Sequence, residues 1–429
     1  MKRKDLLKTI IIDNQNRQFP LGWQRELIVP IDNKKIITLS GVRRSGKTFH
    51  LYNLISRLIK SGVKREEIVY LNFEDERLGL KQADLQDILL TYQELYSDVD
   101  LQKVYFFFDE IQEVDGWEKF VTRIYNDVSR HIFITGSDAK LLSREIATSL
   151  RGRALNFQVY PLTFFEYLNI TKPGFNLHRT ADQAKAKHAL SRFIKQGGFP
   201  ELITEKGEFH QAILQEYFNV MLMRDLIDRY DITQTAMIKY FCKRVIGASS
   251  GEISVNKIYL ELKSQDYKIS KDTLYEYLGY IEAIYMIQLV PKYAHSIVKS
   301  ELSQKKTYVI DTGLGIAMDY KLSQDKGRML ENMVVMEMIK LGKQVNYQKN
   351  GSECDMVIVD KEQVVQAIQI CEQMDDLETR KREVKGLVAT CQANNLKKGT
   401  VVTMDSEEEW LEQGISIHVV PAWKFLLER

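Results

Sequence analysis

The chain has 429 residues, of which 44% are hydrophobic, with only 23 Gly and 7 Pro, so it is neither disordered nor collagen-like, and its length predicts about three domains. Its 60 Lys and Arg nearly balance 58 Asp and Glu, leaving a net charge of +2. This balance excludes a basic field over the whole molecule, so a nucleic-acid partner would have to bind a local patch.

Short β-rich runs alternate with longer amphipathic stretches over the first 165 residues. Because this alternation is typical of βαβ units, it predicts a parallel sheet. The runs 105–108 and 132–134 are apolar without polar alternation, so we expect central strands that helices cover on both faces. The expected strands are residues 35–40, 68–73, 104–109, 132–135 and 155–160.

The rest of the chain is expected to form three further parts. Residues 166–247 show the apolar spacing of helices, interrupted by a turn signal at Gly197-Gly198-Phe199-Pro200. Residues 248–315 contain two helical patterns followed by a β-hairpin, which is the order of a winged helix. A helix at 329–341 and four later strands predict a small α/β layout in residues 316–429. The predicted domains are therefore 1–165, 166–247, 248–315 and 316–429.

Cysteine usage and hydropathy predict the environment of the chain. Cys242, Cys354, Cys371 and Cys391 are widely spaced, with no CxxC pair and no histidines at finger spacing, which favours a reduced, cytoplasmic protein without a structural zinc ion. The apolar run 104–108 has only five residues, far below the roughly 20 that span a bilayer. We therefore expect no membrane partner.

The first expected strand runs into the sequence GVRRSGKT at residues 41–48. This sequence matches the phosphate-loop pattern G-x-x-x-x-G-K-[ST] at a strand-to-helix turn. Glycines let the backbone curl so that its amides point inward, and the start of the helix adds partial positive charge. Lys47 is expected to reach the terminal phosphates, and Thr48 to ligate Mg²⁺. The predicted ATP-binding residues here are Gly41, Arg44, Ser45, Gly46, Lys47 and Thr48.

Two carboxylates follow the apolar strand that ends near residue 108. Asp109 has the position of an acid that organises Mg²⁺ in phosphate-loop ATPases. Glu110 is the natural general base for a water that attacks the γ-phosphate, because binding alone does not need a second carboxylate. A solvated charge at the strand end is the alternative for Glu110.

Polar residues also follow two other expected strands. Ser137 follows the strand expected at 132–135, near the expected position of a γ-phosphate or an attacking water, and is a candidate phosphate sensor. Asp138 and Thr135 are further candidates. Ser137 or Asp138 could equally cap the next helix. Glu74 and Asp75 follow the second strand. They either border the nucleotide-binding site or are solvated charges at the strand end.

These elements resemble the AAA+ class of P-loop ATPases, in particular a prokaryotic branch whose ATPase core precedes a nuclease-like domain of unknown function. The resemblance spans nearly the whole chain and is more specific than a lone phosphate loop. Its marks are GVRRSGKT, LNFEDERL from Leu71, FFFDEIQEVDGWE from Phe106, ITGSDAKLLS from Ile134, LRGRALNFQVYPLTFFEYL from Leu150 and GGFPEL from Gly197.

The resemblance implies a catalytic arginine and self-assembly. In AAA+ proteins an arginine that follows the sensor helix contacts the γ-phosphate bound by a neighbouring subunit, and Arg151 or Arg153 is similar in position. Such a cation offsets the charge that develops on the transferred phosphoryl group. The alternative is an arginine paired with a surface carboxylate. A homo-oligomer is the implied assembly.

Double-stranded DNA is a candidate partner of the winged-helix-like part. The helix expected at 270–285 carries Lys271, Thr273, Tyr275 and Glu276 on its polar side, as suits a helix in a major groove. A wing-like basic stretch follows, and its side chains could contact phosphates. These side chains are Lys292, His295, Lys299, Lys305 and Lys306.

The C-terminal part is similar to metal-dependent PD-(D/E)xK nucleases. Glu331, Asp355 and Gln369 follow the helix, strand, strand spacing of their ligands. An active enzyme of this class uses a lysine two residues after the third ligand, but Cys371 stands there, and a neutral thiol cannot supply that cation. We therefore expect a degenerate nuclease used for binding or assembly. Lys381 or Lys385 on the following helix could take over the missing role.

The expected fold is α/β: a P-loop parallel sheet, a helical subdomain, a winged helix and a restriction-endonuclease-like C-terminal α/β domain. The expected function is Mg²⁺-dependent ATP binding and hydrolysis that switches a DNA-associated assembly. One alternative is a nucleotide-gated signalling or scaffold protein with slow hydrolysis. The other is an ATP-regulated nuclease.

Overall fold

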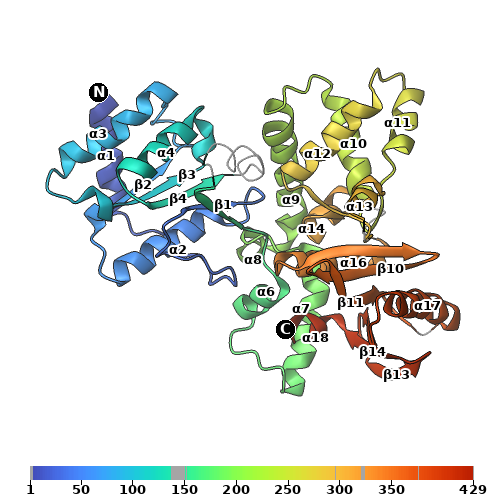
Figure 1. Ribbon diagram of the computed structural model, residues 1–429. Coiled ribbons are helices and arrows are strands. Elements are labelled where there is room, and N and C mark those ends of the chain that lie inside the picture. Colours follow the sequence, from blue (N-terminus) through green and yellow to red (C-terminus); the bar gives the residue numbers. More distant parts are fainter. Residues whose placement is uncertain are drawn as a thin grey trace. The chain divides into compact units, whose positions relative to one another are not determined.

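A five-stranded parallel sheet forms the centre of the first part of the computed structural model (Figure 1). The structure describes residues 3–136, 150, 152–294, 296–319, 324–374 and 376–428. The chain divides into two compact units between Tyr160 and Pro161. Among the described residues, no helix combines the length and apolar character needed to cross a bilayer.

The strands of the first unit lie in the order β2-β3-β4-β1-β5, and each adjacent pair is parallel. The prediction of a parallel sheet is therefore confirmed, as is the interior position of β3 and β4. Their bounds are β1 Ile36–Ser40, β2 Ile68–Asn72, β3 Tyr105–Asp109, β4 His131–Gly136 and β5 Ala154–Gln158.

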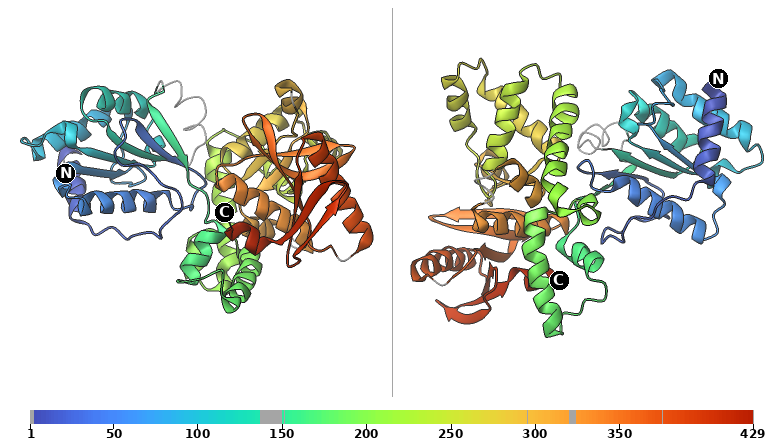
Figure 2. Two further views of the ribbon diagram at one scale, coloured as in Figure 1. Left: turned by 60° about the horizontal axis from the view of Figure 1, so that its bottom comes forward. Right: turned by 180° about the vertical axis from the view of Figure 1, so that it is seen from behind.

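Helices cover both faces of this sheet (Figure 2). Side chains of α1, α3 and α4 pack with Phe106 and Phe108 on one face, whereas side chains of α2 pack with Phe107 and Phe133 on the other. This explains why β3 is apolar without alternation. The helices are α1 Arg3–Asn16, α2 Lys47–Lys60, α3 Leu85–Leu95 and α4 Trp117–Asp127, with 3₁₀ turns at Arg65–Glu67, Gln82–Asp84, Leu101–Lys103 and Ile111–Glu113.

The second unit begins with helices, as the apolar spacing predicts. The expected break after α7 is present, because Gly197 has φ +80° and an added Cβ would lie 1.9 Å from Asp311 Oδ1. Asp311 also accepts a 2.6 Å bond from the Gly198 amide, which joins this turn to α14. The helices are α6 Phe164–Thr171, α7 Thr180–Gln196, α8 Glu201–Thr204, α9 His210–Val220, a π-helix at Met221–Asp228 and α10 Thr235–Gly247, with a 3₁₀ turn at Gly207–Phe209.

A small antiparallel sheet with strand order β6-β8-β7 follows α10. Two helices connect β6 to β7, and the short α13 lies between β7 and β8. The expected helix, helix, hairpin sequence is therefore present, with an additional strand before it. The bounds are β6 Gly251–Glu252, α11 Val255–Ser264, α12 Lys271–Ala283, β7 Ile287–Val290, α13 Ile297–Leu302, β8 Lys306–Val309 and α14 Thr312–Met318.

A six-stranded mixed sheet completes the second unit, in the order β13-β14-β12-β11-β10-β9. Side chains of α17 form a core with β10, β11 and β12, and α16 packs against β9 and β11. The bounds are α16 Lys326–Lys340, β9 Gln344–Asn350, β10 Ser352–Asp360, β11 Gln363–Ile370, α17 Leu377–Ala393, β12 Lys398–Thr403, β13 Glu408–Glu412, β14 Ile415–Pro421 and α18 Ala422–Leu427.

Candidate active site

The loop between β1 and α2 is shaped by close backbone packing. Gly41 has φ +145°, and a Cβ there would lie 2.0 Å from the Val159 carbonyl oxygen, so a side chain has no room. Gly46, at φ +98°, is the N-cap of α2, and no side chain in the described residues caps this helix. The first amides of α2 are therefore available to an anion at the positive end of the helix.

Lys47 folds back over this loop and is only 4% exposed. Its Nζ donates to the carbonyl oxygens of Gly41 and Val42, at 3.2 and 3.4 Å. The same nitrogen lies 3.5 Å from Glu110 Oε1. A buried ammonium group thus lies between the phosphate loop and the acid pair.

The strand order brings Asp109 and Glu110 to this loop. β4 lies between β1 and β3, and Thr135 near its end contacts both acids. The Thr135 hydroxyl donates to Asp109 Oδ1 and accepts a 2.9 Å bond from the Glu110 amide. The Thr48 hydroxyl also hydrogen-bonds to Asp109. The two expected Mg²⁺ ligands therefore meet, and oxygen ligands suit that ion.

Electrostatics distinguish the two acids. Burial, followed by the Glu110 charge, raises the pKa of Asp109 above its ordinary value, although hydrogen bonds from Thr135, Thr48 and Tyr70 oppose this shift. Burial would also raise the pKa of Glu110, but the combined effect of Lys47, Gln112 and Arg43 outweighs it and lowers that pKa. Glu110 is therefore a carboxylate at neutral pH, with Lys47 as its main counter-ion.

Ser45 provides an independent indication that the loop accepts a ligand. The residue is fully buried, and among the described residues its hydroxyl has no hydrogen-bond partner. A buried hydroxyl without a partner is costly, and a phosphate oxygen would satisfy it. Arg25 steadies the loop from outside, because its guanidinium donates to the carbonyls of Ser45 and Tyr160 at 3.1 and 2.8 Å.

The structure therefore brings most of the expected site residues together. The exception among the catalytic candidates is Arg153, which precedes β5 and whose carbonyl accepts a bond from the Ile36 amide at the start of β1. Because the strands are parallel, Arg153 lies at the amino edge of the sheet and the phosphate loop lies at the carboxyl edge. Its guanidinium lies over the Tyr125 ring. Ser137, Asp138 and Arg151 lie outside the described residues.

The sequence left the roles of two neighbouring residues open and did not predict two others. Glu74 contacts the phosphate loop through a 3.0 Å ion pair with Arg43, whereas Asp75 pairs with Arg77. Tyr70, which donates a 2.9 Å bond to Asp109 Oδ2, was not anticipated, and neither was Arg25. A tyrosine inside the apolar β2 was the available signal for Tyr70.

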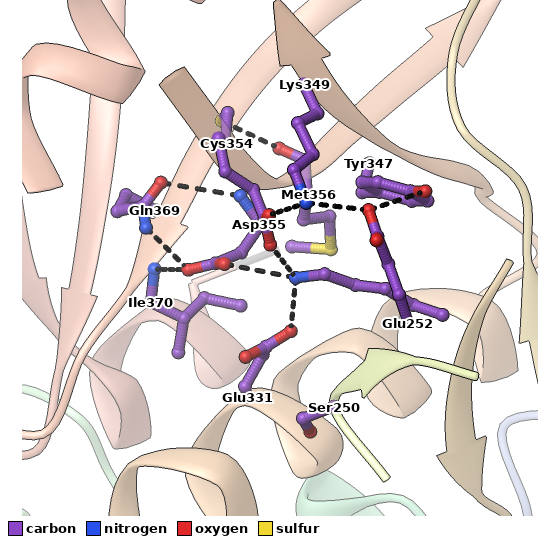
Figure 3. A network of polar contacts seen from close by, with 12 residues as sticks. Ser250, Glu252, Glu331, Tyr347, Lys349, Cys354, Asp355, Met356, Gln369 and Ile370 are labelled. Atoms are coloured by element: carbon purple, nitrogen blue, oxygen red, sulfur yellow. Dashed lines mark hydrogen bonds and ion pairs between the residues drawn. The ribbon is translucent and has the colours of Figure 1, made fainter. Parts of the chain in front are cut away.

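The C-terminal acids also come together (Figure 3). Gln369 Nε2 donates to Asp355 Oδ2 at 2.7 Å, and a β-bulge in β10 falls between Cys354 and Val357. Burial raises the pKa of Cys371 to about 12, so this thiol is neutral, as expected. Glu383 of α17 also accepts a 2.5 Å bond from Gln369 Nε2.

The expectation that Lys306 contacts phosphates in a wing is wrong. Its side chain is 3% exposed and forms ion pairs with Glu331, Glu353 and Asp355, because every residue of β8 is buried. Lys305 pairs with Glu301 at 3.2 Å, and His295 lies outside the described residues. Lys381 and Lys385, the candidates for a migrated lysine, are exposed on α17.

Two family models and several known proteins match most of this chain. A family model described as an AAA domain matches residues 33–168, and one described as a domain of unknown function (DUF8612) matches residues 187–326. An uncharacterised protein of Methanocaldococcus jannaschii is 33% identical over 448 residues, covering 99% of this chain and 96% of that protein. An uncharacterised protein of Haemophilus influenzae is 30% identical over 338 residues, covering 78% and 82%.

Two solved structures also match part of this chain. The Walker-type ATPase of Pyrococcus abyssi has a TM-score of 0.42 and 16% identity, with 74% of this chain and 95% of that chain covered. The ORC1 protein of Aeropyrum pernix, solved in complex with DNA, has a TM-score of 0.27 and 14% identity, with 76% and 93% covered.

Proposed function

We propose that this chain, which belongs to the prokaryotic AAA+ family of P-loop ATPases, binds ATP with Mg²⁺ and hydrolyses it. The observation that carries the proposal is the position of Lys47, buried between the phosphate loop and Glu110, with Thr48 and Asp109 hydrogen-bonded beside it. Phosphate binding, metal binding and water activation would then share one small volume.

Each residue has a distinct role in this proposal. The first amides of α2, the Ser45 hydroxyl and Lys47 bind the phosphates, and Thr48 and Asp109 hold Mg²⁺. When bound, Mg²⁺ neutralises charge on the β- and γ-phosphate oxygens. Glu110 orients and deprotonates the attacking water.

The Lys47–Glu110 pair suggests how binding prepares the base. A triphosphate attracts Lys47 more strongly than one carboxylate does, because it carries several negative charges. Once Lys47 turns to the phosphates, Glu110 loses the main interaction that keeps its pKa low. Glu110 then becomes a stronger base at the moment when the substrate is in place.

A catalytic role for Arg153 requires a second subunit. Within one chain it lies at the sheet edge opposite the phosphate loop. We propose that it stabilises the phosphoryl group bound by a neighbouring copy, which makes a homo-oligomer the active form. Arg151 remains the other candidate for this catalytic arginine, and Ser137 remains a candidate phosphate sensor.

The topology supports a winged helix in the second unit. α10, β6, α11, α12, β7 and β8 follow in the order of that fold, with strand order β6-β8-β7. α12 exposes Lys271, Tyr275 and Glu276, so a contact with duplex DNA would rest mainly on this helix. We propose that hydrolysis switches a DNA-associated assembly and that the four-part division at residues 165, 247 and 315 reflects these roles.

Steady-state phosphate release with and without duplex DNA tests the proposal. We expect Mg²⁺-dependent turnover that DNA stimulates and that Glu110→Gln slows by about 10²-fold or more. Turnover that is slow and indifferent to DNA would favour the nucleotide-gated scaffold. The absence of turnover under every condition, with ATP bound, would contradict hydrolysis as the function.

A further inference from the structure

We infer that the Lys306 ammonium is the built-in cation of the C-terminal acidic cluster, and that it occupies the position a divalent metal would take in a nuclease of similar fold. Lys306 Nζ lies 2.8 Å from Glu353 Oε1, 3.0 Å from Glu331 Oε1 and 3.2 Å from Asp355 Oδ1. The inference does not depend on the proposed ATPase activity, because all four residues belong to the second unit.

The number of donors and acceptors supports this assignment. An ammonium group has three N–H donors and no acceptor, and here it faces three carboxylates. Lys306 is 3% exposed, so its charge is acceptable only because it is paired. Tyr308, two residues along the same strand, donates a 2.8 Å bond to Glu331 Oε1, so the inward side of β8 is built to meet the acids.

Two further carboxylate oxygens of the cluster also have partners. Asp355 Oδ2 accepts bonds from Gln369 Nε2 and the Ile370 amide, at 2.7 and 3.1 Å (Figure 3). Glu353 Oε2 lies 3.3 Å from Lys349 Nζ. Among the described residues, no group of three or more His, Cys, Asp or Glu side chains is arranged to hold a metal ion. These acids are therefore organised around an ammonium group.

Lys306 differs from a catalytic lysine in its position. In the nuclease pattern the lysine follows the third ligand on the same strand, at the position of Cys371. Lys306 instead comes from β8, in a different sheet, and contacts the acids directly. A cavity of about 540 Å³ borders the cluster and is lined by Glu331, Asp355 and Cys371, but Lys306 is not among its lining residues.

The cluster also joins the winged-helix-like part to the end domain. Asn332 of α16 exchanges two bonds with the backbone of Val309 in β8, at 2.8 and 2.9 Å. Arg328 donates to the backbone carbonyls of Gly247 and Ser249. Together with Lys306 these contacts fix β8 to α16 and β10. The cluster therefore acts as a structural junction that needs no metal.

Titration with Mn²⁺ in the absence of nucleotide tests the inference, because removal of Lys306 should expose three carboxylates to a metal. The proteins are the full-length wild type, Asp355→Asn, Lys306→Met, Lys306→Met/Asp355→Asn and, as the matched control, Lys305→Met, which removes the adjacent, partly exposed lysine. The wild type and Lys306→Met are each compared with the corresponding Asp355→Asn derivative, so that Mn²⁺ bound near Asp109 contributes equally to both measurements. We expect Lys306→Met to bind Mn²⁺ at least tenfold more tightly than its Asp355→Asn derivative.

The wild type decides the outcome even if Lys306→Met fails to fold. We expect wild type, Asp355→Asn and Lys305→Met to bind Mn²⁺ identically. Mn²⁺ binding by the wild type that Asp355→Asn removes would overturn the inference, as would Mn²⁺-dependent plasmid nicking that Asp355→Asn abolishes. A folded Lys306→Met protein without Asp355-dependent Mn²⁺ binding would also overturn it.

Discussion

Replacement of Glu110 by Gln is expected to slow hydrolysis and to tighten ATP binding at the same time. The substitution removes the negative charge 3.5 Å from Lys47 Nζ. At an effective dielectric constant of about 20, the Coulomb attraction across that distance is about 5 kcal/mol. ATP must compete with this attraction for Lys47, so even a third of it would change the ATP dissociation constant by more than tenfold.

The expected kinetic effect has a separate cause. The amide side chain of the Glu110→Gln variant cannot accept the proton of the attacking water, so kcat should fall by about 10²-fold or more. Calorimetry with ATP and Mg²⁺ measures the first effect, and single-turnover phosphate release measures the second. Glu113→Gln is the matched control, because it removes an exposed carboxylate from the same short 3₁₀ turn and should change neither quantity.

The reasoning would be refuted by either of two results. Equal turnover in Glu110→Gln and wild type would exclude the general-base role. Weaker ATP binding by Glu110→Gln would show that Lys47 is not held in competition between the acid and the phosphates.

Three further predictions concern Glu331, Ser45 and Arg153. The folded pKa of Glu331 is about 8, whereas its ordinary value is 4.5, so the folded state binds more protons than the unfolded state between these pH values. The free energy of unfolding should therefore fall as pH rises from about 4.5 to 8, and Glu331→Gln should flatten this dependence in urea denaturation. An unchanged slope would contradict the raised pKa of Glu331. Ser45→Ala should weaken ATP binding several-fold in calorimetry without lowering the melting temperature, since its hydroxyl has no partner to lose among the described residues. Mixing inactive Arg153→Ala with inactive Lys47→Ala should restore part of the ATPase rate, and no recovery in mixed oligomers would exclude the arginine's role across subunits.

The sequence predicts the first unit well because its signals are local. The phosphate loop, the apolar β3 and the acids after it each lie within a few consecutive residues, and parallel strands bring their carboxyl ends to one edge. α1 was not anticipated, because its buried apolar residues Leu7, Ile10 and Ile11 lie among charged and polar neighbours. Its helical stripe becomes meaningful only where it packs on the sheet.

The contacts that were missed are non-local. Lys306 follows Lys305 in a basic run, and nothing in that run distinguishes the buried side chain of Lys306 from the partly exposed side chain of Lys305. Its partners lie 25 to 49 residues further along the chain. Tyr70 likewise meets Asp109 only because β2 pairs with β3. Tertiary pairing, rather than composition, determines these interactions.

Calorimetric titration of ATP into the folded protein at millimolar Mg²⁺ tests the central claim most directly. The account predicts one ATP site per chain in the wild type and its loss in Lys47→Ala, with both proteins showing the circular dichroism of a folded chain. A wild type that takes up no ATP, or a Lys47→Ala variant that binds ATP equally well, would contradict it.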